Sequence, residues 1–468
     1  MKKRYKVPCR THFSGSEIPN LLTQVKTEVK TLLKGVGSLA ITTDCWTSTA
    51  NEPFIATSGH FIDKQWRLIE VQLACSYFEG SHTGEAIAQK VQEALKEMAP
   101  TATCSAMVSD SAPNMKNCGT RLSFPHLSCA CHDLQLAIND ALKEAGLDVL
   151  LKKCRAVVGH FKHSAKESAA LKKAILDANP NAKVWKVKQD VPTRWNSTFL
   201  MLQRLDLLGA PITTVLYRNQ TKKIQDNFIL TPSELLTVKH LVEILGPMEE
   251  ITRGLSGASY STLSMVYPIM STLVTKLPNP PPEGTEALVN KLKETITSRF
   301  LTDFDVTTGL ACFLDPRFKA LSFLREDWKE LVLNAIKEEL KKAPVAQRAP
   351  KIMKTSSNSI FGSLASSLSP ATTQEKDELE KYLDHPITIE ESEFLTFNVF
   401  QFWKSLEATL PGLASVAKKI LAVPASSVPV ERFFSKAGLI VTKKRASLSA
   451  NKVEALMFLG VNLKFFNE

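Results

Sequence analysis

The stretch GSLAITTDCWTS, residues 37–48, decides the fold of this 468-residue chain. It begins with the apolar run from Leu39 to Ile41, continues with two threonines that favour extended backbone, and reaches Asp44. This pattern predicts a buried strand that carries a carboxylate to the rim of a sheet, where α/β sheets present their chemistry. Trp46 shares the face of Asp44 if the strand continues. The alternative is that Asp44 caps a turn, which is a common use of aspartate after a strand.

The positive charge of the chain is concentrated in one segment. The formal net charge is +11, and residues 152–194 contain eleven Lys and Arg against three Asp and Glu. Such a segment favours a polyanionic partner, most simply nucleic acid, and the alternative is a solvated basic face. Apolar residues make up 44% of the chain, which excludes a disordered polymer.

Cysteines and terminal residues indicate the compartment. The nine cysteines show no regular disulfide spacing, so we expect free thiols in a reducing compartment. The N-terminus, MKKRYKVPCRTHFSGSE, has no apolar signal region, and we expect no run long enough to span a bilayer and no membrane partner. Basic clusters at residues 2–4 and 443–445 fit nuclear import signals, although such triplets are common.

The first 145 residues predict a mixed sheet. Apolar periodicity and turn residues give a loose arm at 1–16, helices at 16–34, 81–98 and 132–145, and strands at 37–48, 53–63, 66–78, 104–110 and 124–131. We also expect a short helix between the last two of these strands. Three strands able to pair antiparallel, followed by strand–helix units, suggest a sheet with helices on both faces. This is the layout of a ribonuclease-H-like fold, whose first strand is central and whose fourth lies beside it. Asp44 and Asp110 would then be neighbours.

The remainder of the chain predicts mainly helix. We expect helices at 157–177, 197–216, 231–253 with a break near Gly246 and Pro247, 393–406, 413–421, 429–437 and 449–467. Residues 277–284 read as a Pro-rich turn, and residues 343–373 are rich in Ser, Pro and Ala and are expected to be mobile. The predicted regions are an N-terminal arm and helix (1–35), the first part of the core (36–195), a helical insertion (196–395) and a C-terminal region completing the core (396–468).

A third acid, Glu431, falls in VPASSVPVERFFSKAGLIVTKKR, residues 423–445. Pro429 fits the first turn of a helix, which places Glu431 in that turn. An acid on a helix packed beside two strand-borne acids would make an oxygen site for a pair of Mg²⁺ ions. The alternative is a surface acid that interacts with the helix dipole or with Arg432.

Seven stretches in consistent order resemble the hAT transposase superfamily, most closely the BED-finger hAT-like proteins of animals. They are KVPCRTHFS (6–14), LAITTDCWTS (39–48), AMVSDSAPNM (106–115), LSCACHDLQLAI (127–138), VVGHFKHSAKESAALKK (157–173), DVPTRWNSTFLMLQRL (190–205) and the tail from 402 to 463. The tail, with PASSVPVERFFSKAG and TKKRASLSANKVEALMFL, is the most specific and looks like the hAT C-terminal dimerisation region. The resemblance implies an α/β ribonuclease-H-like mixed sheet that is interrupted by a large all-helical insertion.

The resemblance also implies a DDE site for DNA cleavage and strand transfer, formed by Asp44, Asp110 and Glu431 with Mg²⁺ or Mn²⁺. It implies DNA contacts for the following residues: Trp46, Cys129, His132, Arg194 and Trp195, and the basic cluster Lys443, Lys444 and Arg445. Trp195 matches the tryptophan that stacks on an extruded base, since stacking offsets the unpairing free energy. The alternatives are that Trp46 is a core residue, and that Cys129, Cys131, His126 and His132 are a zinc set or, as their spacing favours, buried side chains.

The resemblance to the hAT superfamily also implies self-association. Dimer contacts are expected from the tail, namely from Phe433, Phe434, Leu456, Met457 and Phe458, with an intramolecular core as the alternative. The first residues hold one Cys and one His, so we expect no BED finger and no structural zinc in this chain, and Ser111 stands where the family more often has Asn. Two functions stay open: a nuclear, dimeric, DNA-binding hAT-type transposase derivative with a potential DDE site, or a domesticated, non-catalytic transcription or chromatin regulator.

Overall fold

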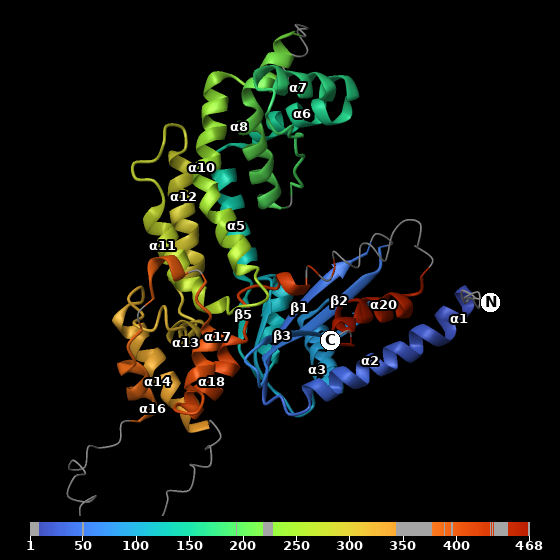
Figure 1. Ribbon diagram of the computed structural model, residues 1–468, viewed down its shortest axis with the longest axis vertical. Helices are drawn as coiled ribbons and strands as arrows, with labels where there is room; N and C mark the ends of the chain where they lie inside the picture. The colour runs from blue at the N-terminus through green and yellow to red at the C-terminus, as the bar shows by residue number, and fades with distance from the viewer. Residues whose placement is uncertain are drawn as a thin grey trace, which may run out of the picture. The chain divides into compact units, whose positions relative to one another are not determined.

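The computed structural model describes residues 9–48, 51–192, 194–218, 228–342, 377–387, 389–394, 396–430, 432, 434 and 448–466. The chain forms two compact units, drawn in Figure 1. The first unit comprises Met1–Leu127, Gly257–Met265 and Asp305–Glu468, and the second comprises Ser128–Ser256 and Val266–Phe304. The predicted region boundaries at 35, 195 and 395 stay predictions.

The described part of the first unit is built on a sheet of five strands in the order β3-β2-β1-β4-β5. The strands are β1 (Ser38–Thr47), β2 (Pro53–Ile62), β3 (Leu68–Tyr77), β4 (Thr103–Ser109) and β5 (His126–Ser128). β1 pairs antiparallel with β2 and parallel with β4, and β2 pairs antiparallel with β3. The predicted mixed sheet with a central first strand is therefore confirmed. β5 is shorter than predicted because Ala130 already begins a helix.

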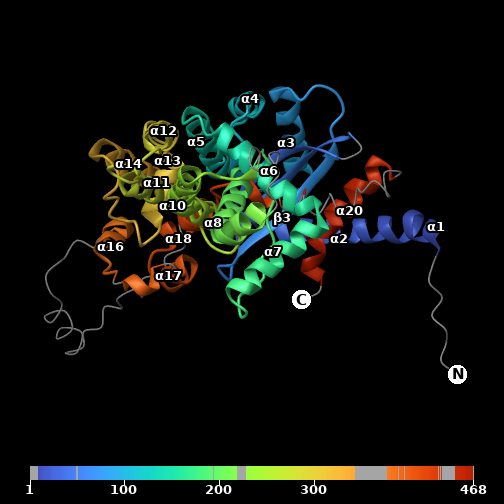
Figure 2. The ribbon, with the colours of Figure 1, turned by 90° about the horizontal axis from the view of Figure 1, so that it is seen from above.

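One face of the sheet is covered by the helices α2 (Ile18–Leu33) and α3 (Gly84–Met98). Val25, Val29 and Leu33 recur at helical spacing and are fully buried against Leu39 and Ile41 of β1. Each such burial contributes about 1.5–3 kcal/mol. The predicted loose arm is wrong for residues 10–16, because α1 (Arg10–His12) and a π-helical turn (Phe13–Glu17) continue into α2 as one rod, as Figure 2 shows.

α3 packs closely on α4 (Pro113–Arg121). The Thr83 hydroxyl caps the start of α3 by accepting a hydrogen bond from the backbone N–H of Ala86. A Cβ atom at Gly84 would lie 2.4 Å from Oδ1 of Asn117 on α4, so only glycine permits this approach. The short helix predicted between the strands of Asp110 and His126 is thereby confirmed, and it holds the end of β4 against the rest of the unit.

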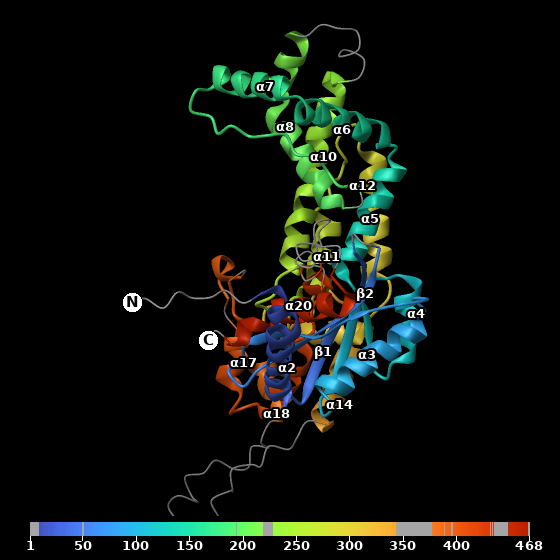
Figure 3. The same cartoon turned by 90° about the vertical axis from the view of Figure 1, so that its right-hand side faces the viewer.

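The C-terminal helix α20 (Ala450–Asn462) covers the outer edge of the sheet at β3. Phe458 and Leu459 join the core shared with α2, whereas Val453 and Met457 pack on the opposite face with Phe54 of β2. Figure 3 shows α20 beside α2. The buried Asn462 side chain accepts a hydrogen bond from the Gln72 N–H at 3.0 Å and donates one to the Gln72 carbonyl oxygen at 3.0 Å. α20 therefore supplies the partner that an edge strand lacks.

The first unit also contains a helical part: α13 (Val306–Leu314), α14 (Glu326–Lys342), α16 (Glu378–Asp384), α17 (Val399–Leu406) and α18 (Pro411–Leu421). Two buried aromatic donors fix α16 and α17 to the end of α13. The Tyr382 hydroxyl donates to the Phe313 carbonyl at 2.8 Å, and Trp403 Nε1 donates to the Leu314 carbonyl at 2.7 Å. The buried Asp315 carboxylate is paired with Arg317 at 2.7 Å.

The described part of the second unit is mainly helical. It contains α5 (Ala130–Glu144), α6 (Asp148–His163), α7 (Ala165–Ala178), α8 (Trp195–Arg218), α10 (Pro232–Leu255), α11 (Val266–Lys276) and α12 (Glu286–Ile296). The single helix predicted at 157–177 is wrong, because the Ser164 hydroxyl caps α7 by accepting from the Glu167 N–H. The break predicted near Pro247 is also wrong, because α10 continues through it.

α8 is an exception to the expectation that no run of the chain is long enough to span a bilayer. Among the described helices it is the one that is long and apolar enough to cross a membrane by length and composition. A core helix of a soluble protein passes the same test, and 44% of the apolar window of α8 is buried. The segment 343–373, predicted to be mobile, and most of the predicted helix at 429–437 lie outside the described residues.

Candidate active site

Asp44 lies on β1, three residues before its end, and Asp110 directly follows the end of β4, the parallel neighbour of β1. The register pairs Thr42 of β1 with Val108 of β4, and both acids stand two residues further along. Strands in a sheet are about 4.8 Å apart, so continuation of this register would bring the two acids side by side on one face. Both side chains are half-buried. The predicted pairing of the strands that carry these acids is therefore confirmed, and the proximity of the two carboxylates, 66 residues apart in sequence, stays a prediction.

The negative charges of Asp44 and Asp110 both act on the thiol of Cys45. Burial, and then the negative charges of Asp44 and Asp110, raise the pKa of the Cys45 thiol to about 12. Asp44 Oδ1 accepts the Cys45 N–H at 2.8 Å, and Asp110 Oδ1 accepts the Ala112 N–H at 3.2 Å. These contacts hold two hard oxygen donors at one rim of the sheet, which is the donor chemistry that Mg²⁺ and Mn²⁺ prefer.

His126 is a neighbour of this rim whose role sequence reasoning missed. The Ser109 hydroxyl donates to the Asp110 carbonyl at 3.1 Å and lies 2.8 Å from His126 Nε2. Which of the two groups donates in the Ser109–His126 hydrogen bond depends on the tautomer of the ring. Burial, followed by the charge of Lys116, lowers the pKa of His126. The neutral ring thus fixes the end of β4. The sequence feature that could have indicated this role is the histidine at the start of the neighbouring strand β5.

The third predicted acid, Glu431, lies outside the described residues, as do Phe433, Lys443, Lys444 and Arg445. Within the described ranges, no group of three or more His, Cys, Asp or Glu side chains is arranged to hold a metal ion. The DDE set therefore stays a prediction, and two of its three acids are carried by β1 and by the residue after the neighbouring strand β4.

Trp46 packs within the first unit. Its ring stacks on Phe434 with 5.6 Å between centroids and an interplanar angle of 16°, and it lies 5.6 Å from the ring of Phe54. Trp46 remains half-buried, so one part of the ring is accessible beside Asp44. The structure therefore gives this residue a packing contact, and its predicted contact with DNA stays a prediction.

Cys129, Cys131 and His132 lie at the start of α5 in the second unit. Cys129 is fully buried and precedes the first helical residue, and its carbonyl accepts the Asp133 N–H at 3.0 Å. The Cys131 thiol lies 3.8 Å from the Thr252 carbonyl and 3.6 Å from the Ser256 hydroxyl. Cys131 thus packs on the end of α10, and His132 is half-buried on the first turn of α5.

Trp195 is the first residue of α8 and is only 2% exposed. Its ring packs 6.3 Å from that of Phe199, while the preceding Arg194 is exposed. The Ser197 hydroxyl holds the turn before the helix, since it lies 2.7 Å from the Val191 N–H and 2.7 Å from the Arg194 carbonyl. A base could stack on Trp195 only after the groups that bury its ring move away, so its predicted stacking role requires a rearrangement.

Trp185 is an aromatic residue of the basic segment that sequence reasoning missed. Lys183 Nζ lies 3.9 Å from the centre of its ring, and the guanidinium carbon of Arg204 lies 4.2 Å from it. The Arg204 side chain also donates to the Lys186 carbonyl at 2.9 Å. The sequence feature that could have indicated a binding role is the segment KVWKVK, in which Trp185 stands among Lys183, Lys186 and Lys188. Interleaved cations and aromatics are typical of surfaces that bind nucleic acid.

The residues predicted to form the dimer interface are mostly covered within one chain. Phe434, Met457 and Phe458 are 8%, 2% and 3% exposed, and Leu456 is half-exposed. The intramolecular core that was the alternative therefore accounts for most of their apolar surface. Their predicted dimer contacts stay predictions, and Leu456 is the member of the set with accessible surface.

Comparison with known proteins assigns the regions of the chain. The family model of the hAT family C-terminal dimerisation region matches residues 378–463, that of the ZBED1 RNase-like domain matches residues 42–133, and that of the ZBED1 RNase-like helical domain matches residues 127–244. The matches cover most of the sheet, the helical second unit up to residue 244, and α20.

Curated relatives match over nearly the whole chain at low identity. "Putative AC transposase" of Zea mays is 25% identical over 94% of this chain and 58% of its own length. "Putative transcriptional regulator tpeD" of Talaromyces stipitatus is 26% identical over 91% and 54%, and human "Zinc finger BED domain-containing protein 4" is 26% identical over 99% and 41%. The chain thus spans about half the length of the curated relatives that it matches. Together with the family models and the mixed sheet, these matches show that the chain belongs to the hAT-like proteins, with RNase-like regions of the ZBED1 type and a hAT C-terminal dimerisation region.

Proposed function

We propose that this chain is a transposase-derived, nuclear DNA-binding protein that self-associates and carries a potential DDE site for DNA cleavage and strand transfer. The observation that carries the proposal is that Asp44 lies on β1 and that Asp110 directly follows β4, the strand that pairs parallel with β1. Glu431 is the proposed third acid. The transposase relatives of plants support the assignment, since they match over nearly the whole chain.

The residue types fit a divalent metal, because neighbouring strands supply two carboxylates, whose oxygens are the ligands that Mg²⁺ and Mn²⁺ prefer. Bound there, Mg²⁺ or Mn²⁺ would stabilise the charge that develops on the oxygens of a phosphodiester during in-line displacement. Asp44 and Asp110 would hold the ions. The Cys45 and Ala112 N–H groups orient the two carboxylates, and the Ser109–His126 pair fixes the end of β4.

Contacts to DNA are assigned to the basic segment of the second unit. Cationic side chains would neutralise phosphates, and Trp185, held between Lys183 and Arg204, offers an aromatic surface to a base. Arg194 and Trp195 add an exposed cation and a ring that becomes accessible if the groups that bury it move away. Self-association is assigned to the region that matches the hAT dimerisation model.

A nicking assay tests the proposal. The full chain is incubated with supercoiled plasmid, and with duplexes that carry any terminal inverted repeats flanking the gene, in Mn²⁺, Mg²⁺ or EDTA. We expect metal-dependent nicking that Asp44→Asn and Asp110→Asn abolish and that Asp327→Asn leaves unchanged. Asp327 is a matched control because it is an exposed aspartate of α14. Equal nicking by Asp44→Asn and the unaltered chain would refute the catalytic assignment.

A second function is favoured by the residue after the second acid. Ser111 follows Asp110 where the resembling family more often has Asn, and a relative from Talaromyces stipitatus is named as a putative transcriptional regulator. In this alternative the chain binds DNA and self-associates without cleaving. DNA binding that survives both Asp→Asn changes, with no metal-dependent nicking by the unaltered chain, would select this function. A single-copy gene without flanking repeats would agree with it.

A further inference from the structure

A cavity of about 760 Å³ lies in the first unit, at the end of the sheet opposite to Asp44 and Asp110. It is lined by the start of β1 at Ser38, the start of β4 at Thr103, and the end of β2 at Ile62. Asp44 lies six positions after Ser38 on β1, which at about 3.3 Å per residue is roughly 20 Å. A ligand in this cavity therefore occupies a site separate from the candidate active site.

The cavity carries an excess of positive charge. Its lining contains six cationic side chains and only two carboxylates, Asp63 and Glu339. The Asp63 carboxylate pairs with Arg67 at 2.8 Å, and Glu339 is shared by Lys342 and Lys419. Within the described ranges, no carboxylate forms an ion pair with Lys34 or Lys64. Two exposed ammonium groups are thus available to an anion.

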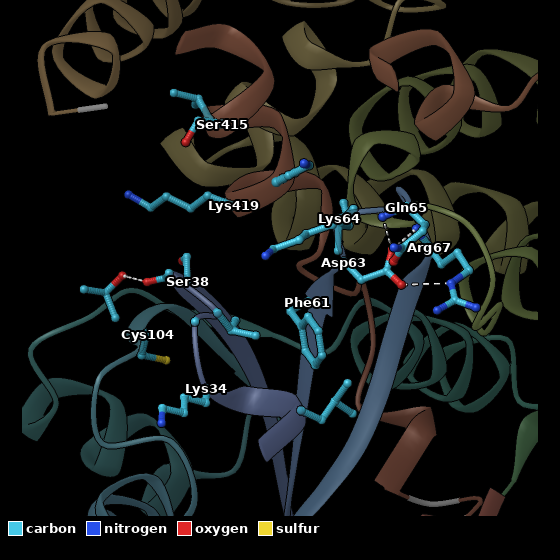
Figure 4. A pocket seen from close by; sticks show the side chains of 18 of the residues that line it. Lys34, Ser38, Phe61, Asp63, Lys64, Gln65, Arg67, Cys104, Ser415 and Lys419 are labelled. Atoms are coloured by element: carbon cyan, nitrogen blue, oxygen red, sulfur yellow. Dashed lines mark hydrogen bonds and ion pairs between the residues drawn. The ribbon is translucent and has the colours of Figure 1, made fainter. Parts of the chain in front are cut away.

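The cations come from separate segments, as Figure 4 shows for Lys34, Lys64 and Lys419. Lys34 follows α2, Lys64 lies in the turn between β2 and β3, and Lys419 lies on α18. Segments that are far apart in sequence have therefore been brought around one space. Clustering of like charges is unfavourable in the absence of an anion, so such convergence favours an anionic ligand.

The cavity also has uncharged groups that a ligand can use. Phe61, Ile62 and Val416 line it with little surface exposed to solvent, which gives the space an apolar wall. Ser38 Oγ is buried and has no hydrogen-bond partner within the described structure. A buried hydroxyl without a partner is unfavourable, and a polar group of a ligand would satisfy it. The volume lies within the range of small-molecule sites.

From this combination we infer that the cavity is a second anion site, which binds a phosphate-bearing ligand of nucleotide size through Lys34 and Lys64. The phosphates lie among the ammonium groups, and the base packs toward Phe61 and Ile62. The ligand is either a free nucleotide or one nucleotide unit of a nucleic-acid strand, because the two present the same chemistry. This inference is independent of the proposed cleavage function.

Binding measurements on the full chain test the inference. ATP is titrated by calorimetry in EDTA, so that a metal-dependent site at Asp44 and Asp110 contributes nothing, and a single-stranded oligonucleotide is titrated by fluorescence anisotropy. The double change Lys34→Glu with Lys64→Glu is compared with Lys337→Glu, an exposed lysine of α14 that does not line the cavity. We expect the double change to weaken binding about tenfold or more, as loss of two charge-assisted contacts predicts, and the control to leave it unchanged.

The outcomes separate the two sources of phosphate. Selective loss of ATP affinity identifies a free nucleotide, and selective loss of oligonucleotide affinity alone identifies a nucleic-acid strand. Equal effects of the double change and the control on both probes, or no binding of either probe to the unaltered chain, would overturn the inference. As a measurement that needs no variant, the bound probe should protect Lys34 and Lys64 from acetylation more strongly than Lys337, and equal modification of all three would also count against the site.

Discussion

Replacing Asn462 by alanine should release α20 from the edge of the sheet. In the folded chain the Asn462 amide takes the place of a neighbouring strand, since it bonds both the N–H and the carbonyl oxygen of Gln72. Asn462 is fully buried, so water cannot replace it without local opening. The change leaves two backbone groups of β3 without partners.

The magnitude follows from these two groups. A buried polar group without a partner costs about 1–3 kcal/mol, so the change should destabilise the packing of α20 on β3 by about 2–6 kcal/mol. Asn462→Leu keeps the branched shape and fills the site without the hydrogen bonds, so it should be nearly as destabilising. Asn462→Asp keeps the acceptor for the Gln72 N–H but faces the Gln72 carbonyl with a second acceptor. Its destabilisation should therefore grow as the pH rises and the carboxylate ionises.

Native-state hydrogen exchange measures this change where it occurs. A local destabilisation of about 3 kcal/mol accelerates exchange of the Gln72 amide by roughly 150-fold, because every 1.4 kcal/mol is a factor of ten. Peptides that cover β1 should change much less. Asn334→Ala is the matched control, because Asn334 is exposed on α14, and surface substitutions of this kind stay within about 0.5 kcal/mol. Exchange of β3 in Asn462→Ala that matches the control would refute the edge-strand argument.

Three further predictions concern pH, assembly and DNA. Burial lowers the pKa of His60 to about 4, so the unfolded chain binds a proton at a higher pH than the folded chain does. The free energy of unfolding should therefore fall by about 3 kcal/mol as the pH falls from about 6.5 to 4. Urea denaturation should show this loss, and His60→Gln should reduce it. Met457→Glu buries a charge and should unfold the first unit, as measured by circular dichroism, and a folded Met457→Glu chain would contradict the buried position. Leu456→Glu should keep the fold and lower self-association, as measured by light scattering. Trp185→Ala should weaken oligonucleotide binding by about 1–3 kcal/mol in fluorescence anisotropy, and unchanged affinity would remove Trp185 from the interface.

Local sequence patterns predicted the centre of the sheet well. The buried run that ends at Asp44 and the run that ends at Asp110 both formed strands, and the mixed topology made them neighbours. These features are predictable because alternation and burial act within a few residues of each other. The capping of α7 was also readable, since Ser164 and Glu167 have the spacing of an N-terminal cap, but helix formers on both sides suggested continuity.

Contacts between distant segments could not be predicted in this way. The pairing of Asn462 with Gln72 joins residues 390 positions apart, and no local pattern marks either residue. The cavity near Ser38 likewise depends on segments that meet only in the folded first unit. The burial of Trp195 and Met457 was open from sequence, because an aromatic or apolar side chain serves a core and a binding surface equally well.

The position of α20 on the sheet has a consequence for synthesis of the chain. α20 covers β3, yet roughly 370 residues are translated between the end of β3 and the start of α20. At about 5–20 residues per second this takes about 20–75 s. During that interval the nascent sheet presents the Gln72 edge and the apolar surface that Met457 and Phe458 later cover. We therefore expect the ribosome-bound chain to engage chaperones until its last helix emerges.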